Sequence, residues 1–158
     1  MSFTHLDESG HARMVDVTDK APTVRSATAR GFVRCAPEVV ASLRDGRVPK
    51  GDVLAVARIA GIQGAKRCAE LLPLAHIIGV HGASVDLAIE DGGVAIEATV
   101  RTADRTGVEM EALTAVSVAA LAIVDMVKGL DKSSSIENVR ITAKEGGRSG
   151  SWKRPGEA

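Results

Sequence analysis

One segment of the sequence combines ionisable side chains with an otherwise apolar helical pattern. Between Ala112 and Val127 nearly every residue is Ala, Val, Leu, Ile or Met. At about 100° per residue, the polar exceptions share one narrow strip of a helix. That strip carries Glu111, Thr114, Ser117, Asp125 and Lys128. Asp125 and Lys128 are three residues apart and can meet, and apolar surroundings shift pKa values toward those that suit proton transfer. The helix therefore predicts a site for acid–base chemistry.

The same strip has a structural interpretation, in which Asp125 and Lys128 form an ion pair beside one solvated edge of the helix. An isolated Asp-x-x-Lys pair usually has that role. Glu111 favours a site over a structural ion pair, because it is a third ionisable residue on the same strip of a helix whose other residues are apolar and expected to be buried. We favour a site and keep the ion pair as the alternative.

Three further clusters suit proton or phosphate chemistry, and each has a second interpretation. His76 follows the apolar, Pro-interrupted stretch Leu71–Ala75, where a histidine is either a hydrogen-bonded core residue or a catalyst. Gly146–Gly150 either offers backbone amides to phosphate or forms a flexible loop, and it lacks the strand–loop–helix context of a P-loop. A basic run beside Asp16, with Lys50 further along, is either a solvated face or a polyphosphate site, since Arg supplies paired donors and Lys a point charge. The run comprises Arg13, Lys20, Arg25, Arg30 and Arg34.

Alternating patterns and helix-boundary residues predict the elements that position these groups. Strands are expected over Thr28–Cys35, Val80–Ala88, Val94–Arg101 and Val139–Lys144, with Glu90–Gly93 as a hairpin turn. Helices are expected over Pro37–Asp45, from the Asp52 cap to the residue before Pro73, and over Glu109–Leu130. This order predicts an α+β fold of the ferredoxin-like type, an antiparallel sheet with helices packed on one face. Gly61 and Gly64 lie inside the second helix and indicate a close approach of another backbone.

The length and composition bound the class of protein. The chain has 158 residues, which suits one domain, and we divide it into a loose arm over 1–11, a single domain over 12–153 and a polar tail over 154–158. Trp152, Phe3 and Phe32 are its only aromatic residues, so the core must be aliphatic. Small aliphatic side chains bury little area each, and a chain of this size often gains further burial by oligomerising.

Charge and cysteine usage exclude several classes of partner. The chain has 20 Lys and Arg against 20 Asp and Glu, which implies neither nucleic acid nor an anionic membrane. Cys35 and Cys68 have no metal-ligand spacing, so we expect two buried thiols in a reducing compartment. The N-terminus has no apolar h-region, and we expect no stretch that approaches the roughly 20 apolar residues of a membrane span. These features predict a soluble, cytoplasmic protein.

Five segments of the chain together carry a family pattern. The most specific segment is Arg105–Leu121, continuing to Asp125, Met126 and Lys128. The other segments are Met14–Val17 with Lys20, Thr23 and Arg25; Lys50–Leu54 with Ala57–Ile62; Leu72–Leu74 with His76; and Lys144–Gly150. Together they resemble the MoaC family, the cyclic pyranopterin monophosphate synthases of molybdenum cofactor (molybdopterin) biosynthesis. The likeness extends from Ala12 to Trp152 and is far more specific than any short motif.

The resemblance implies a lyase that rearranges a cyclised dihydro-GTP to cyclic pyranopterin monophosphate with loss of pyrophosphate. It also implies a homohexamer, a trimer of dimers, with active sites at subunit interfaces. No motif fixes a metal, and we expect no cofactor apart from any magnesium that travels with the substrate phosphates.

The resemblance further implies roles for individual residues. Asp125 and Lys128 would be the acid–base pair, and Lys50 a second essential amine that protonates or orients the ring. His76, a catalytic candidate as well, would hold phosphate together with Arg25. The substrate pocket would be lined by Leu74, Ala75, His76, Met110 and Glu111. The remaining candidates for substrate binding are Asp16, Lys20, Lys66, Glu109 and Lys144.

Two positions depart from the family pattern. Ala75 stands where the family usually has Cys, and we expect it to line the pocket and leave activity intact. Ser133–Ser135 replaces a Met-containing segment, and serines loosen a helix end. The departures keep two alternatives open. One is a catalytically silent relative that binds a nucleotide or pterin. The other is a structural oligomer whose charged strip is an interface ion network.

Overall fold

A five-stranded antiparallel sheet is the framework of the computed structural model, which describes residues 5–157. Its strands are β1 (Thr23–Arg34), β2 (Gly82–Glu90), β3 (Gly93–Asp104), β4 (Ser135–Glu145) and β5 (Trp152–Lys153). They lie in the order β2-β3-β1-β4-β5, and each neighbouring pair is antiparallel. Alternation predicts the first four strands. The two-residue β5 is too short to carry such a pattern.

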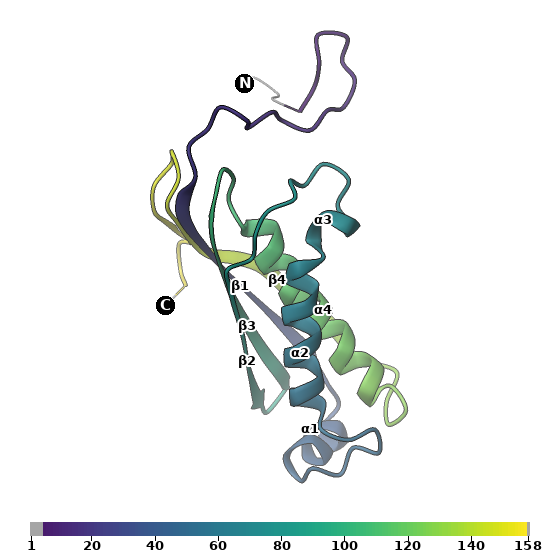
Figure 1. The fold of residues 1–158 in the computed structure, drawn as a ribbon. Helices are drawn as coiled ribbons and strands as arrows, with labels where there is room; N and C mark the ends of the chain where they lie inside the picture. The colour runs from purple at the N-terminus through teal and green to yellow at the C-terminus, as the bar shows by residue number, and fades with distance from the viewer. Residues whose placement is uncertain (1–4, 158) are drawn as a thin grey trace.

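The helices all pack on one face of this sheet. They are α1 (Pro37–Arg44), α2 (Val53–Lys66), α3 (Cys68–Leu71) and α4 (Glu109–Val127). The long helices α2 and α4 lie side by side across the sheet (Figure 1). The predicted α+β, ferredoxin-like architecture is confirmed. The expected continuous helix up to Pro73 is wrong, because the backbone leaves helical geometry at Arg67, whose N–H bonds to the Gly64 carbonyl, and resumes as α3.

Two glycines let α2 and α4 approach each other closely. A Cβ on Gly61 would stand 2.9 Å from the carbonyl oxygen of Ala115, and one on Gly64 would stand 2.9 Å from Val118 Cβ. No such contact is tolerated without a shift, so the predicted close packing at both glycines is confirmed. The core between helices and sheet is aliphatic, with Val33, Ile96 and Ile123 among its fully buried residues. Cys35 and Cys68 are both buried and free, as predicted.

Helix α4 is long and apolar enough, by length and composition alone, to cross a membrane, which the sequence analysis did not expect. Its apolar window has a mean hydropathy of 1.8, and half of the window is buried within the protein. The buried side packs against α2, β1, β3 and β4. A core position therefore accounts for the composition of this helix.

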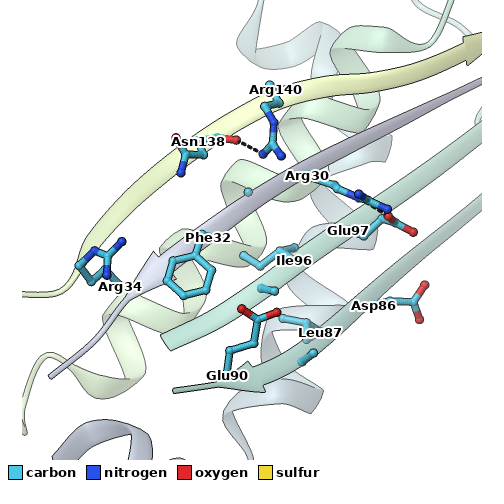
Figure 2. Close-up of a pocket in the computed structure, with 13 residues that line it drawn as sticks. Arg30, Phe32, Arg34, Asp86, Leu87, Glu90, Ile96, Glu97, Asn138 and Arg140 are labelled. Atoms are coloured by element: carbon cyan, nitrogen blue, oxygen red, sulfur yellow. Dashed lines mark hydrogen bonds and ion pairs between the residues drawn. The ribbon is translucent and has the colours of Figure 1, made fainter. Parts of the chain in front are cut away.

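The opposite face of the sheet is polar. Side chains alternate along β1, so Ala27, Ala29 and Val33 are buried beneath the helices while Arg30 and Arg34 extend from the outer face (Figure 2). An open cavity of about 610 Å³ lies on this face, and of the candidate residues from the sequence only Arg30 and Arg34 of the basic run line it.

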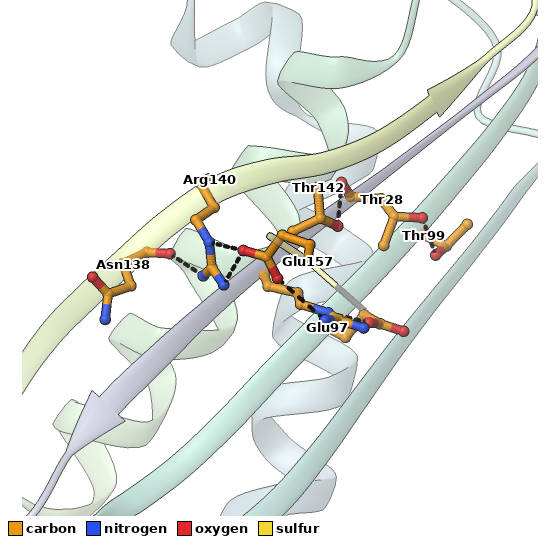
Figure 3. Close-up of polar contacts among 8 residues, drawn as sticks. Thr28, Glu97, Thr99, Asn138, Arg140, Thr142 and Glu157 are labelled. Atoms are coloured by element: carbon orange, nitrogen blue, oxygen red, sulfur yellow. Dashed lines mark hydrogen bonds and ion pairs between the residues drawn. The ribbon is translucent and has the colours of Figure 1, made fainter. Parts of the chain in front are cut away.

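Hydrogen bonds or ion pairs order both ends of the described chain. Near the N-terminus, the Asp7 carboxylate accepts hydrogen bonds from the N–H groups of Ser9 and His11, both at 2.9 Å. Residues 1–4 of the predicted loose arm lie outside the described residues. In the predicted polar tail, the Glu157 carboxylate bridges Arg30 and Arg140 on the outer face of the sheet (Figure 3).

Candidate active site

A carboxylate flanked by two ammonium groups lies at the C-terminal end of α4. Lys128 Nζ is 2.7 Å from Asp125 Oδ1, and Lys50 Nζ is 3.1 Å from Asp125 Oδ2. Lys50 also donates to the backbone carbonyl of Asp125 at 2.9 Å. The hydrogen bonds from Lys128 and Lys50 hold the pKa of the Asp125 carboxyl below its ordinary value. Asp125 is thus a carboxylate that stays ionised at neutral pH, with two cations within hydrogen-bond reach.

Local structure explains how Lys50 reaches a helix that lies 75 residues further along the chain. Lys50 lies near the end of the loop between α1 and α2. The next residue, Gly51, turns the backbone with a φ of 103°, a conformation that favours glycine. Asp52 then caps α2 by accepting a hydrogen bond from the N–H of Ala55 at 3.0 Å. Because the start of α2 is fixed beside the end of α4, the Lys50 side chain extends onto Asp125.

A second cluster surrounds a cavity of about 710 Å³ at the N-terminal end of α4. Most of the predicted substrate-binding residues line it: Lys20, Leu74, Ala75, His76, Glu109, Met110, Glu111 and Lys144. Further lining residues were not predicted: His5, Val15, Val17, Thr106, Gly107, Ile141 and Trp152. Of these, Val15 and Val17 carried a signal as members of the Met14–Val17 motif, and Thr106 and Gly107 as members of the Arg105–Leu121 segment.

Glu111 and His76 give this cavity its acid–base character. The Glu111 residue is only 4 % exposed, and burial raises the pKa of its carboxyl. His76 Nε2 lies 2.5 Å from the carbonyl oxygen of Val15. Since a carbonyl can only accept, Nε2 donates this hydrogen bond. The cavity therefore holds a carboxyl whose pKa is raised and a histidine whose ring is oriented by its Nε2 hydrogen bond.

A smaller cavity of about 240 Å³ adjoins the main one, and Arg25 and Lys144 are among the residues that line it. Arg25 donates from Nε to the Asp104 carbonyl and from Nη2 to the Arg105 carbonyl, each at 3.3 Å. These two bonds fix the guanidinium while leaving Nη1 available. Gly107, Glu109 and Lys144 line both cavities, so the two spaces adjoin.

The two clusters are well separated within one chain. Asp125 lies 14 residues after Glu111 on α4, which at 1.5 Å per residue corresponds to about 21 Å. The side chains of Lys50, Asp125 and Lys128 are 48 %, 57 % and 58 % exposed, and none of them lines the main cavity. A single chain thus presents two clusters of ionisable groups at opposite ends of one helix.

The structure places several predicted residues outside both clusters. Asp16 lines neither cavity, and its carboxylate accepts hydrogen bonds from the backbone and hydroxyl of Thr18. Lys66 is the last residue of α2 and lines neither cavity. Within the basic run, Arg30 and Arg34 lie apart from Arg25, because strand alternation turns them to the outer face, where they pair with Glu97 and Glu137.

The two departures from the family pattern each have a defined place in the structure. Ala75 lines the main cavity. In the serine run, the Asp131 carboxylate accepts hydrogen bonds from the N–H and hydroxyl of Ser133, and the Ser135 hydroxyl bonds to Glu137. The serines therefore close a hydrogen-bonded turn after α4. Across residues 5–157 no group of three or more His, Cys, Asp and Glu side chains is arranged to hold a metal ion.

These features define an α+β protein of ferredoxin-like fold with an acid–base cluster and a cavity lined by both lysines and carboxyl groups, which suits an enzyme that acts on a small molecule. Residues 14–147 match the model of the MoaC family. The chain is 60% identical to a cyclic pyranopterin monophosphate synthase of Chloroflexus aurantiacus over 155 residues, covering 97% of this chain and 95% of that protein. It is 61% identical over 152 residues to the synthase of Streptomyces coelicolor (96% and 89% covered). It is 53% identical over 156 residues to that of Geobacter sulfurreducens (98% of each). The chain belongs to the MoaC family.

Proposed function

We propose that this chain is a cyclic pyranopterin monophosphate synthase of molybdenum cofactor biosynthesis. Its reaction would convert 3',8-cyclo-7,8-dihydro-GTP to cyclic pyranopterin monophosphate and pyrophosphate. The observation that carries the proposal is the identity of 60% over 97% of the chain with a protein of that name. The charged groups at both ends of α4 supply the acid, base and cation functions that this chemistry needs.

The proton-accepting role is assigned to an ionised carboxylate, and the proton-donating roles to ammonium groups and to a carboxyl whose pKa is raised. Asp125, ionised between two ammonium groups, would act as the base, with Lys128 as its acid partner. Lys50 would protonate or orient the ring, since its ammonium already lies against Asp125. Glu111, whose pKa is raised by burial, would donate a hydrogen bond or proton to the ring system inside the cavity.

Closure of a cyclic phosphate with loss of pyrophosphate needs cations at the leaving group more than covalent help from the protein. Arg25 and Lys144 at the cavity, together with His76, would supply them. Any magnesium would enter with the substrate phosphates.

The active site would be completed between subunits of a homohexamer built as a trimer of dimers. Two observations support this assembly: the clusters lie about 21 Å apart along α4, and an exposed apolar surface lies between them. Leu121 is 58 % exposed on α4, and Ile59 is 66 % exposed on the neighbouring α2. Antiparallel docking of these faces would bring the Asp125 cluster of one copy to the cavity of its partner. A cytoplasmic location is part of the same proposal and fits the two free thiols.

The decisive experiment is anaerobic turnover. Purified protein is mixed with the cyclised dihydro-GTP, and both pyrophosphate and the cyclic pterin phosphate are followed. Equal amounts of the two products support the synthase. Binding without release of either product would overturn it in favour of the catalytically silent relative.

A further inference from the structure

The segment that follows β5 stays attached to the sheet and reaches its outer face. Beyond the two residue pairs of β5, the Arg154 N–H donates to the Thr142 carbonyl at 2.8 Å, and Arg154 Nε donates to the Ile141 carbonyl at 2.7 Å. Gly156, with a φ of 82°, then turns the chain, and the Glu157 N–H bonds to the Arg154 carbonyl at 3.3 Å. The chain is therefore held along β4 beyond the end of β5.

Glu157 is the main side-chain anchor of this segment. Its Oε1 atom lies 2.5 Å from both Nε and Nη2 of Arg140 (Figure 3). Its Oε2 atom lies 3.3 Å from Nη1 of Arg30, which also pairs with Glu97. The Glu157 side chain is only 15 % exposed. A carboxylate that makes several charge-assisted hydrogen bonds away from solvent holds its partners more firmly than an exposed ion pair does.

Trp152 lies at the start of the same segment and lines the main cavity. It follows the glycine loop Gly146–Gly150 and pairs with Lys144 of β4. The guanidinium of Arg154 lies 5.6 Å from the centroid of its ring. A strand of two residues supplies few backbone hydrogen bonds, and a terminal segment stays ordered only where other contacts hold it. The place of the indole ring therefore depends on the contacts further along the chain, at Arg154 and Glu157.

We propose that Glu157 is a positioning residue, whose ion pairs with Arg140 and Arg30 hold β5 on β4 and so fix Trp152 as a wall of the substrate cavity. The inference rests on the proposed function and adds to it a group on the outer face of the sheet. A fixed indole offers a flat apolar face on which a purine-derived ring can stack. The Asp125 cluster lies at the other end of α4, so the anchor acts on substrate binding and not on proton transfer.

Trp152 is the only tryptophan of the chain, so its fluorescence reports the anchor directly. Glu157→Gln should release the segment, shift the emission to longer wavelength and raise quenching by acrylamide about twofold, as the residue goes from 41 % to nearly full exposure. Arg140→Gln should do the same, and the double variant should add little, because both changes break one contact. Glu137→Gln is the matched control. It breaks the ion pair with Arg34 on the same outer face and should leave the fluorescence unchanged.

Turnover separates positioning from a purely structural role. Glu157→Gln should raise the KM for the cyclised dihydro-GTP about three- to tenfold, the range expected for loss of one aromatic contact, and leave kcat near the wild-type value. Unchanged fluorescence in Glu157→Gln, or an equal change in Glu137→Gln, would overturn the anchor. Altered fluorescence with an unchanged KM would overturn the role in substrate binding. If the wild type shows no turnover, the synthase fails, and the fluorescence of the variants alone supports or overturns the anchor.

Discussion

Asp125 is the residue on which the proposed chemistry depends most directly. Its carboxylate is held ionised by Lys128 and Lys50, and all three side chains are about half exposed. Exposed ion pairs contribute little to stability, so Asp125→Asn should fold and assemble as the wild type does. Loss of the base should lower turnover by about 10²- to 10⁴-fold. Circular dichroism and sedimentation check the first expectation, and pyrophosphate release checks the second.

Lys50→Ala separates binding from chemistry. The main cavity does not include Lys50, so the variant should bind substrate with little change in affinity. It should form no cyclic product, since its ammonium is the group assigned to the ring. A normal product yield from Lys50→Ala, or from an intact Asp125→Asn, contradicts these roles. Disassembly of both variants would instead favour the interface ion network.

Glu111 predicts a dependence of stability on pH. Burial raises its folded-state pKa above the ordinary value of 4.5. The stability that its protonated form contributes is present below the unfolded-state pKa and is lost as pH rises through the folded-state pKa. Glu111→Gln stays neutral, so its free energy of unfolding should rise relative to wild type as pH increases from about 4.5 toward neutrality. Urea unfolding of both proteins across that range measures the difference, and a constant difference would exclude a raised pKa.

At the scale of elements, the contact between α2 and α4 depends on the absence of a side chain at Gly61. Alanine would favour the helix by about 1 kcal/mol. Its Cβ, however, would stand 2.9 Å from the Ala115 carbonyl and 3.0 Å from Val85 Cγ2. Overpacking against backbone should dominate, so Gly61→Ala should lower the free energy of unfolding by about 1 kcal/mol or more. The exposed Gln63→Ala on the same helix should stay within about 0.5 kcal/mol of wild type. A stabilised Gly61→Ala would show that the helices can separate at no cost.

Element patterns explain what the sequence could and could not predict. The strip of α4 follows from helical periodicity alone, so the contact between Asp125 and Lys128 was predictable. The two-residue period of β1 places Arg30 and Arg34 on the face of the sheet opposite Arg25, so this separation could also have been predicted from the sequence. The approach of Lys50 to Asp125 was not, because it depends on how α2 packs against α4. The pairing of Trp152 with Lys144 depends on the glycine loop, and two residues carry no strand pattern.

At the scale of the whole molecule, α4 separates groups that the proposed reaction needs together. The Asp125 cluster and the Glu111 cavity are fixed to the two ends of one rigid helix, so no local motion brings them together within a chain. The proposed isologous pair of copies would solve this geometry, because a two-fold axis across the exposed faces of α2 and α4 would create two equivalent sites. Each site would then take its cavity from one chain and its Asp125 cluster from the other.

This arrangement predicts that two inactive variants restore each other's activity. Asp125→Asn removes the base, and His76→Ala removes a group from the cavity; each alone should turn over poorly. When the two are dissociated, mixed equally and reassembled, a pair of unlike chains contains one site with both parts intact and one with both parts changed. Random mixing should therefore recover activity in about a quarter of the sites. Native mass spectrometry confirms that the chains have exchanged. If exchanged assemblies show no recovery, each chain completes its own site, and the proposed interface is wrong.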